Sequence, residues 1–325
     1  METAFYHKPV LFRETIASLS IRPDGLYIDG TAGGGGHSEA ILQKLTSGRL
    51  LSIDQDPDAI AVCRRRFAPY GERSQLWQGN FGDMQSIAAQ TGFLPCDGVL
   101  LDIGVSSHQL DTPQRGFSYH AQAPLDMRMS QSGPTAADLL ASLPEKEIAR
   151  ILWEYGEEKA AGRIARAIVQ QRESTPITTT LQLADLVRES VPAAVRRGPG
   201  HPARKTFQAL RIAVNGELDR LNEGLDAAFS VLRTGGVLSV ITFHSLEDRM
   251  VKQRMASWCE GCTCPPEFPV CVCGKKPRAE LLYKKGLSAS EEELQENPRA
   301  RSARLRVCRK LCAGPPENGD QSRAE

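Results

Sequence analysis

The chain has 325 residues, of which 41% are hydrophobic, so it can bury the core of two domains or of one domain with a large insert. Lysine and arginine number 40 and aspartate and glutamate 39, which gives a formal net charge of +1. A surface covered throughout by nucleic acid is usually more basic, so any such contact must come from local patches. No uninterrupted apolar stretch reaches about 18 residues, so the sequence gives no support for a transmembrane helix.

The N-terminal residues and the cysteines indicate the cellular compartment. Residues 1–12 lack the basic region, the apolar run and the cleavage site of an export signal. The nine cysteines are odd in number, and five of them lie between Cys259 and Cys273; an odd count without an export signal argues against a disulfide framework. We therefore expect a cytoplasmic protein without membrane association. We expect it to be either a monomer or a homodimer.

Short apolar segments alternate with amphipathic segments through the first hundred residues. The pattern predicts four strands, at 26–29, 50–53, 75–78 and 98–102. It also predicts two helices, at 37–45 and 59–67. Strands and helices that alternate at this spacing are typical of parallel βαβ units. The predicted architecture is therefore a doubly wound α/β sheet.

The alternation stops after Asp102. Residues 105–129 contain several glycines and prolines and predict an irregular loop, whereas 135–191 have the apolar periodicity of several helices. A single long amphipathic helix is expected over 207–232, ended by Gly235 and Gly236. Strands at 237–243 and 303–307 then resume the sheet.

The predicted fold class is thus α/β, a Rossmann-like doubly wound sheet with an inserted all-helical domain. We expect the sheet domain to comprise residues 1–105 and 205–312, with the helical insert at 106–204 for substrate recognition. The polar residues 313–325 predict a disordered tail.

A glycine-rich loop follows the first expected strand. It begins at Asp29 and contains four consecutive glycines at 33–36, where the absence of Cβ atoms lets a ligand approach the backbone. The helix that follows offers N–H groups without intrahelical partners. Asp54 ends the second strand about 20 residues later, where a carboxylate can accept hydrogen bonds from both ribose hydroxyls of a nucleoside.

Tight packing alone explains many glycine-rich loops, so the residues at the other strand ends are needed to distinguish a binding site from core packing. The glycine spacing differs from the GxGxxG of dinucleotide enzymes, which disfavours a nicotinamide oxidoreductase. Phe81 follows the third strand and Asp102 ends the fourth, at the edge where open α/β sheets bind ligands. Together the four strand ends indicate a binding site rather than core packing.

Eight short motifs, in order along the chain, resemble those of the MraW/RsmH family. They are DGTAGGGGH at 29–37, DQDP at 54–57, LDIGVSS at 101–107 with QLD at 109–111, PLDMRM at 124–129, YGEE at 155–158, FQALRI at 207–212, FHSLEDR at 243–249 and NPRARS at 297–302. The resemblance extends from about His7 to Arg309 and is highly specific.

The resemblance implies a class I S-adenosylmethionine-dependent methyltransferase. Enzymes of this family methylate the exocyclic N4 of a cytidine in the decoding (P-site) region of 16S ribosomal RNA, so the implied partner is that RNA within the small ribosomal subunit. Carried over motif by motif, the implied contacts to S-adenosylmethionine are those of Gly35, Gly36, His37, Asp54, Phe81, Asp102 and Gln109.

Asp102 is the first candidate for a catalytic residue. Cytosine N4 is a poor nucleophile because its lone pair is delocalised into the ring, and an acceptor for the amino protons would favour the pyramidal nitrogen of the transition state. The residues after Asp102 lack the aromatic side chain that follows this position in many amino-methyltransferases of nucleobases. An alternative role for Asp102 is to orient the methionine end of the cofactor.

Ser106 and His244 are weaker catalytic candidates. They are candidates because both follow predicted strand ends. A structural role is the alternative for His244. Asp126 and Arg128 lie in the predicted loop and could hold the target base or the RNA backbone, or could form an internal ion pair.

A basic, acid-free segment indicates where RNA is bound. No acidic residue occurs from Ser190 to Gly216, a segment with several glycines and prolines. Such a segment suits contact with phosphates, although charge runs are often only solvated faces. The candidate RNA-binding residues are Arg196, Arg197, Arg204 and Lys205.

The cysteine cluster has the composition of a small structural zinc site. Two C-x-C pairs, tighter than the usual C-x-x-C, would supply four thiolates from Cys262, Cys264, Cys271 and Cys273. A loop with reduced, buried thiols is the alternative.

Two other functions remain open at the level of sequence. The chain could methylate another acceptor, such as a small molecule or a protein nitrogen. It could also bind S-adenosylmethionine and RNA in ribosome assembly without catalysis.

Overall fold

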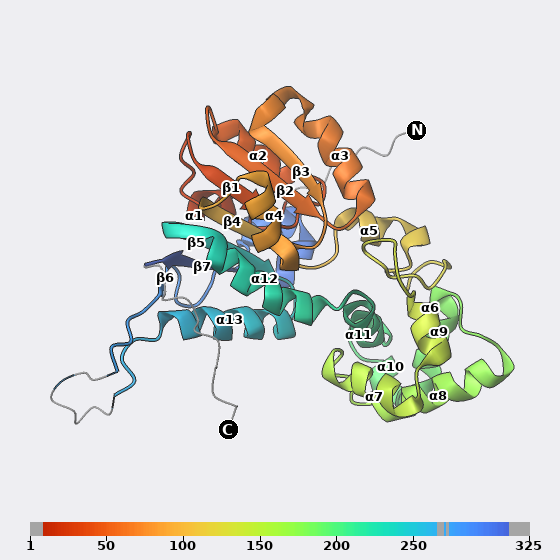
Figure 1. The fold of residues 1–325 in the computed structure, drawn as a ribbon. Coiled ribbons are helices and arrows are strands. Elements are labelled where there is room, and N and C mark those ends of the chain that lie inside the picture. Colours follow the sequence, from red (N-terminus) through yellow and green to blue (C-terminus); the bar gives the residue numbers. More distant parts are fainter. Residues whose placement is uncertain (1–8, 265–269, 271–272, 312–325) are drawn as a thin grey trace, which may run out of the picture. The chain divides into compact units, whose positions relative to one another are not determined.

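The computed structural model describes residues 9–264, 270 and 273–311, in two compact units. The helical unit comprises residues 55–57 and 105–221, and the sheet unit comprises the other described residues (Figure 1). The predicted disordered tail at 313–325 lies outside the described residues.

The sheet unit contains a seven-stranded sheet with the order β3-β2-β1-β4-β5-β7-β6. Strands β1 to β5 are parallel, and β7 pairs antiparallel with both β5 and β6. The strands are β1 (Leu26–Asp29), β2 (Arg49–Asp54), β3 (Ser74–Gln78), β4 (Cys96–Asp102), β5 (Leu232–Thr242), β6 (Ala279–Leu281) and β7 (Arg304–Lys310). The six predicted strands are confirmed, whereas β6, with three residues, is too short to give a recognisable pattern.

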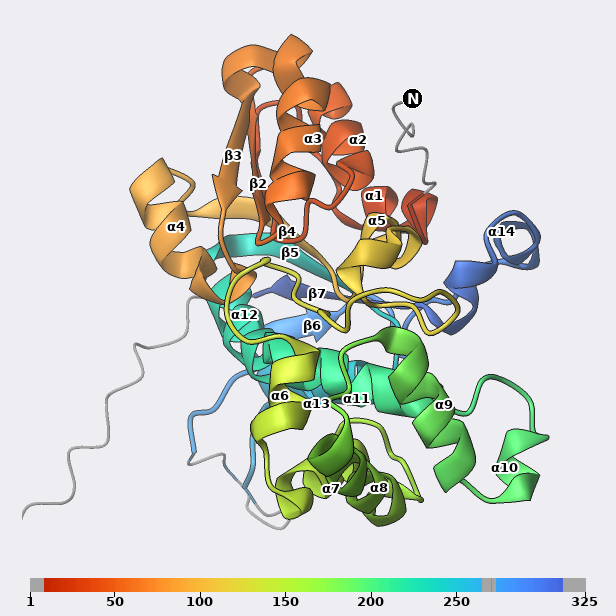
Figure 2. The same ribbon diagram turned by 90° about the vertical axis from the view of Figure 1, so that its right-hand side faces the viewer.

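Helices cover both faces of this sheet, with α2 and α3 on one face and α4 on the other (Figure 2). Buried aliphatic side chains of β1, β2 and β4 form the core between the layers, among them Ile28, Leu51 and Leu100. The helical elements of the sheet unit are α1 (Phe12–Ser18), α2 (Gly36–Lys44), α3 (Pro57–Phe67), η1 (Ala68–Arg73), η2 (Phe81–Asp83), α4 (Met84–Thr91), the last part of α12 (Glu217–Val231), α13 (Ser245–Cys259), α14 (Glu291–Glu296) and η4 (Pro298–Ser302).

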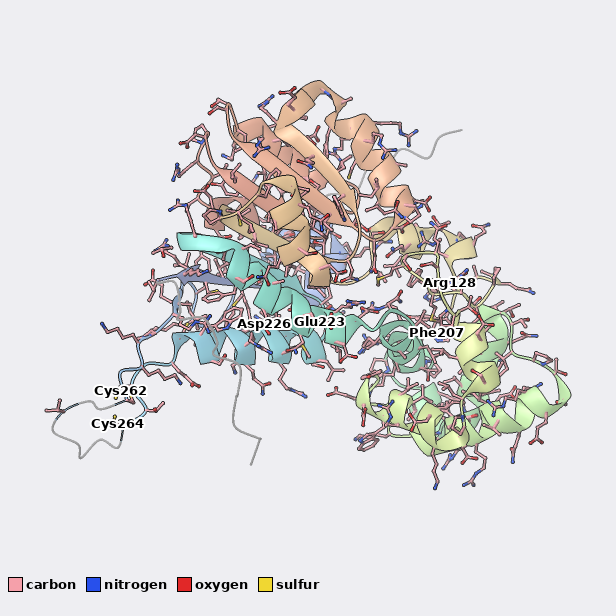
Figure 3. The ribbon with its side chains drawn as sticks, in the orientation of Figure 1. Arg128, Phe207, Glu223, Asp226, Cys262 and Cys264 are labelled. Atoms are coloured by element: carbon pink, nitrogen blue, oxygen red, sulfur yellow. The ribbon has the colours of Figure 1, made fainter. Side chains whose placement is uncertain are left out.

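An ion pair joins α12 and α13 on the same face as α4. Arg254 of α13 donates to Asp226 of α12 at 2.6 Å, and Figure 3 shows Asp226 next to Glu223 along α12. Phe229 of α12 stacks on Trp258 of α13, with ring centroids 4.2 Å apart, so apolar packing lies beneath the ion pair.

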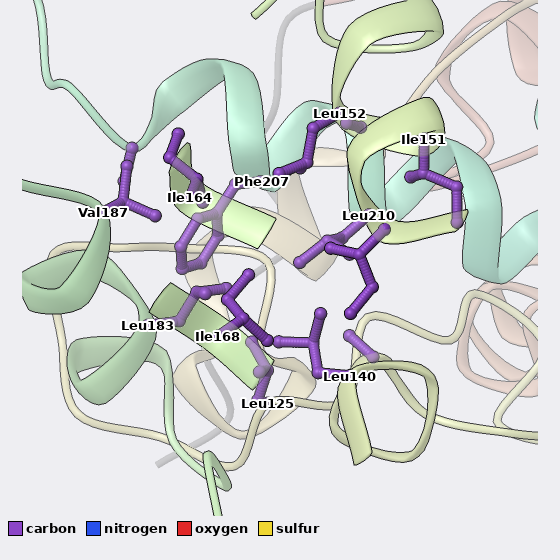
Figure 4. Close-up of a cluster of buried hydrophobic side chains, with 14 of the residues drawn as sticks. Leu125, Leu140, Ile151, Leu152, Ile164, Ile168, Leu183, Val187, Phe207 and Leu210 are labelled. Carbon is purple, nitrogen blue, oxygen red and sulfur yellow. The ribbon is translucent and has the colours of Figure 1, made fainter. Parts of the chain in front are cut away.

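The helical unit is built on one apolar cluster (Figure 4). Its helices are α5 (Ser107–Asp111), η3 (Pro113–Arg115), α6 (Ala136–Ser142), α7 (Glu145–Glu154), α8 (Ala161–Ser174), α9 (Thr180–Ser190), α10 (Ala193–Arg196), α11 (Arg204–Asn215) and the first part of α12. Ile151 of α7, Ile168 of α8 and Leu183 of α9 are all buried in this cluster. The insert predicted from the sequence is therefore helical with its own core.

The helical unit extends beyond the boundary that the sequence indicated. We expected the insert to end at Arg204, but the unit continues to Leu221. Phe207 and Leu210 of α11 are buried in the core of the helical unit, which holds that helix in the insert. An amphipathic pattern shows that one face of a helix is buried but not which core it joins.

The prediction of a single helix over 207–232 is wrong. Helix α11 ends at Asn215, and Gly216 adopts a left-handed conformation with φ of +59° before α12 begins. The N–H of Gly216 donates to the carbonyl of Ile212, as expected of a helix C-cap. A side chain in this conformation costs about 1–2 kcal/mol, so glycine permits the break.

Candidate active site

Three acidic residues end adjacent strands at one edge of the sheet. Asp29 ends β1, Asp54 ends β2 and Asp102 ends β4, and these three strands are parallel neighbours. The carboxyl ends of parallel strands meet at one edge, where open α/β sheets bind their ligands. The predicted convergence of these residues is therefore present in the sheet unit.

The glycine-rich loop leads directly into α2. Gly35 is the N-cap of α2 in a left-handed conformation with φ of +81°, and no side chain caps this end. The first N–H groups of such a helix favour an anion. A Cβ atom on Gly36 would lie 2.4 Å from Pro9, so the loop packs too closely for a side chain there.

Asp54 and Asp29 fix the conformation of the loop. The N–H of Gly33 donates to Asp54 Oδ2 at 2.7 Å. Asp29 is 1% exposed and accepts hydrogen bonds from Ser38 Oγ at 2.7 Å and from the N–H of Thr31 at 3.1 Å. Burial raises the pKa of Asp29 to about 6 in spite of these hydrogen bonds. The loop is therefore held in shape before any ligand binds.

Asp102 carries a buried acceptor atom to which none of the described residues donates a hydrogen bond. Its Oδ1 has no partner among the described residues, and its Oδ2 lies 3.6 Å from His37 Nδ1. Burial raises the pKa of Asp102 to about 8, and the nearby carboxylates of Asp29 and Glu247 add to the effect. Buried polar atoms are nearly always hydrogen-bonded, so the Asp102 carboxyl is ready to interact with a ligand.

Phe81 is held in position by two glycines. A Cβ atom on Gly224 of α12 would lie 2.2 Å from Phe81 Cδ2, and a Cβ atom on Gly30 would lie 3.1 Å from Phe81 Cβ. The aromatic ring therefore lies directly against the backbone of α12. The sequence pattern pointed to Phe81 but gave no indication of the role of Gly224.

Gln109, predicted to bind the cofactor, belongs to the helical unit and is 4% exposed. Its side-chain carbonyl accepts from the N–H of Ser106, and its amide donates to Asp56 Oδ2 at 2.8 Å. The Ser106 hydroxyl in turn accepts from the N–H of Gln109, which completes a capping box at the start of α5. These contacts show how both predicted residues are positioned; their roles remain predictions.

A buried ion pair that the sequence reasoning missed lies beside Gln109. Asp56 is 2% exposed, and its Oδ2 accepts from Arg115 Nη1 at 2.7 Å. Arg115 also donates to the carbonyls of Arg128 and Met129 at 2.9 Å, so it organises the segment expected to be an irregular loop. The DQDP motif contained Asp56, but nothing in the sequence identified Arg115 as its partner.

His244 is the N-cap of α13. Its Nδ1 accepts from the N–H of Glu247 at 3.4 Å, and Glu247 Oε2 accepts from the N–H of His244 at 3.2 Å. This arrangement favours the structural alternative for His244. Asp126 and Arg128 likewise form a bidentate pair, with distances of 2.9 and 2.7 Å, as the alternative of an internal ion pair predicts.

The predicted RNA-binding residues lie around α10 and the start of α11. Arg196, Arg197 and Arg204 are exposed, whereas Lys205 is half-buried and its Nζ donates to the carbonyl of Glu157 at 2.8 Å. His201, between them, stacks on Tyr119 with ring centroids 4.5 Å apart. The basic segment thus combines exposed guanidinium groups with stacked rings.

Three of the four predicted zinc ligands lie together in the sheet unit. The sulfur atoms of Cys262, Cys264 and Cys273 are all within 4.8 Å of one another. Figure 3 shows Cys262 and Cys264 on the loop that follows α13. The fourth predicted ligand, Cys271, lies outside the described residues.

The strand order, the single antiparallel strand near one edge and the glycine-rich loop define a class I S-adenosylmethionine-dependent methyltransferase. The acid at the end of β2 and the uncapped start of α2 suit the ribose and the amino-acid carboxylate of that cofactor. The chain belongs to the MraW methylase family, whose model matches residues 4–311.

Three similar proteins each bear the name "Ribosomal RNA small subunit methyltransferase H". The protein from Symbiobacterium thermophilum is 54% identical over 96% of this chain and 98% of its own length. Those from Heliobacterium mobile and Brevibacillus brevis are each 53% identical, over 94% and 95% of this chain and 99% of their own length. Among the described residues, no helix has the length and apolarity to cross a membrane.

Proposed function

We propose that this protein transfers the methyl group of S-adenosylmethionine to N4 of a cytidine in the decoding (P-site) region of 16S ribosomal RNA. The names of the relatives support a small-subunit ribosomal RNA as substrate. The observation that carries the reaction is the buried Oδ1 of Asp102 at the end of β4, which has no hydrogen-bond partner in the part of the chain that the structure describes. The substrate implies that the protein acts in the cytoplasm on the small ribosomal subunit.

The residues that would hold S-adenosylmethionine surround the edge of β1, β2 and β4. Gly35, Gly36 and His37 at the start of α2 would face the methionine carboxylate, because that helix end favours an anion. Asp54 would accept hydrogen bonds from the ribose hydroxyls, and the Phe81 ring would contact the adenine. When bound, the cofactor supplies an electrophilic methyl group.

Asp102 would act on the amino group of the target base. N4 would gain the methyl group with the sulfur of the cofactor as the leaving group, and it would have to lose a proton. The ionised Asp102 carboxylate would accept a hydrogen bond from N4 and take that proton. Because the pKa of Asp102 is about 8, roughly a tenth of the carboxyl groups are ionised at pH 7, and this basic carboxylate suits a proton acceptor.

The basic segment around α10 would contact the RNA backbone. Arg196, Arg197 and Arg204 are exposed and can each neutralise a phosphate, whereas the Lys205 ammonium donates to the backbone carbonyl of Glu157. The rings of Tyr119 and His201 are stacked and partly exposed, and an unpaired base would stack against them. The helical unit would thus recognise the RNA substrate.

Transfer of label from radiolabelled S-adenosylmethionine tests the proposal. The purified protein is incubated with small ribosomal subunits from cells that lack the enzyme, and the RNA is digested to nucleosides. Label in N4-methylcytidine is the expected result. Label in another nucleoside or in protein would show that the acceptor is not N4 of cytidine. The absence of label in spite of cofactor binding would favour a non-catalytic assembly factor.

A further inference from the structure

The loop between α13 and β6 brings three cysteine thiols together outside the candidate active site. Cys262 and Cys264 lie on the limb that leaves α13, and Cys273 lies on the limb that returns to β6. Cys262 and Cys273 are exposed and Cys264 is half-buried. The contact between residues eleven positions apart is therefore not a product of core packing.

The sulfur–sulfur distances fit a metal better than a disulfide. The Sγ atoms of Cys262 and Cys273 are 3.6 Å apart, whereas a disulfide requires about 2.05 Å. Zinc–sulfur bonds of about 2.3 Å place two sulfurs of a tetrahedral site about 3.8 Å apart. All three sulfurs lie within 4.8 Å of one another, which one ion can span with small adjustments.

A backbone hydrogen bond and an ion pair also hold the two limbs of the loop together. The N–H of Arg278 donates to the carbonyl of Trp258 at 2.7 Å, and Lys275 forms an ion pair with Glu260 at 3.2 Å. The N–H of Cys264 donates to the sulfur of Cys262 at 3.4 Å, a contact that stabilises a thiolate. These contacts therefore hold the two limbs together, and one of them orients the Cys262 thiol, before a metal binds.

We propose that Cys262, Cys264 and Cys273 supply three ligands of a structural zinc site that joins the two limbs of this loop. Soft thiolate ligands in a tetrahedral set select zinc over magnesium or calcium, which prefer oxygen. The site would take no part in methyl transfer and is independent of the proposed function.

Metal content of the full-length protein tests the site. Protein purified without chelators is analysed by mass spectrometry of its metals, before and after addition of zinc chloride. About one zinc ion per chain is expected. The absence of bound zinc after this addition, or the presence of iron and sulfide in its place, would overturn the assignment.

Serine variants identify the ligands. Cys262→Ser and Cys273→Ser are each expected to lose most of the zinc, whereas Cys259→Ser, at the end of α13 and outside the cluster, is expected to retain it. Circular dichroism shows whether each variant is folded. Full zinc content in both cluster variants would refute the site.

Cobalt provides a test that needs no variant. Addition of cobalt chloride to the zinc-free wild-type protein should produce the intense thiolate-to-cobalt absorption and the visible bands of a tetrahedral ion. A spectrum of octahedral cobalt without thiolate bands would contradict the proposal.

Discussion

Replacement of Asp102 by asparagine separates the chemical role of this residue from its structural cost. Asparagine keeps the shape of the side chain and one acceptor oxygen but cannot ionise or take a proton. We expect Asp102→Asn to lower the rate of methyl transfer by about 100-fold or more, the contribution typical of a positioned general base. We expect the same substitution to stabilise the fold at alkaline pH.

The magnitude of the stabilisation follows from the pKa of Asp102. Its ordinary value is 3.8, and burial raises it to about 8 in the folded protein. Between these values the folded state binds a proton that the unfolded state has released, so the free energy of unfolding falls as the pH rises. The fall is about 1.4 kcal/mol per pH unit, or about 4 kcal/mol between pH 5 and pH 8. Asparagine removes this dependence.

Two measurements test this reasoning. The midpoint of urea unfolding is compared for the wild type and Asp102→Asn at pH 5 and pH 8, and the gap between the two proteins should widen at pH 8 in favour of the variant. In the wild type, kcat/KM should rise with pH toward a plateau above about 8, because only the ionised carboxylate accepts the proton. A variant with near wild-type activity and no gain in stability at pH 8 would refute both roles.

Three further variants probe the site and the residues that support it. Gly224→Ala should lower the affinity for S-adenosylmethionine and destabilise the fold by about 1 kcal/mol, because the new methyl group displaces Phe81; calorimetric titration and thermal unfolding measure both effects. Arg196→Ala combined with Arg197→Ala should reduce the slope of log K for RNA binding against log salt by about 1.4–1.8, as for two lost phosphate contacts. Arg115→Met should destabilise the helical unit by about 3–5 kcal/mol in urea unfolding, because Asp56 loses its buried guanidinium partner.

Matched variants serve as controls for these substitutions. Gly162→Ala in α8 adds a methyl group that meets no atom within 4 Å, so it should stabilise the fold by about 0.5–1 kcal/mol. If Gly224→Ala behaves in the same way, the contact with Phe81 has no energetic weight. Arg163→Ala combined with Arg166→Ala removes two exposed charges from α8; an equal change in the salt slope would show that only net charge matters. Unchanged unfolding of Arg115→Met would mean that the buried pair contributes nothing net.

The sequence by itself determined the elements whose signals are local. The apolar segments that became β1, β2 and β4 each end in an acid, and a doubly wound sheet necessarily brings Asp29, Asp54 and Asp102 to one edge. The four consecutive glycines at 33–36 likewise marked the start of α2. Strand periodicity and glycine content depend on neighbours in the chain, so they can be read without the fold.

Only the tertiary structure decided which distant residues meet. The apolar pattern over 207–232 continues through Gly216, because periodicity does not register a single residue in the left-handed conformation. The same pattern could not show that Phe207 is buried in the helical unit rather than against the sheet. The contact of Gly224 with Phe81 and the ion pair of Asp56 with Arg115 join residues far apart in sequence, and such partners are selected by packing and desolvation.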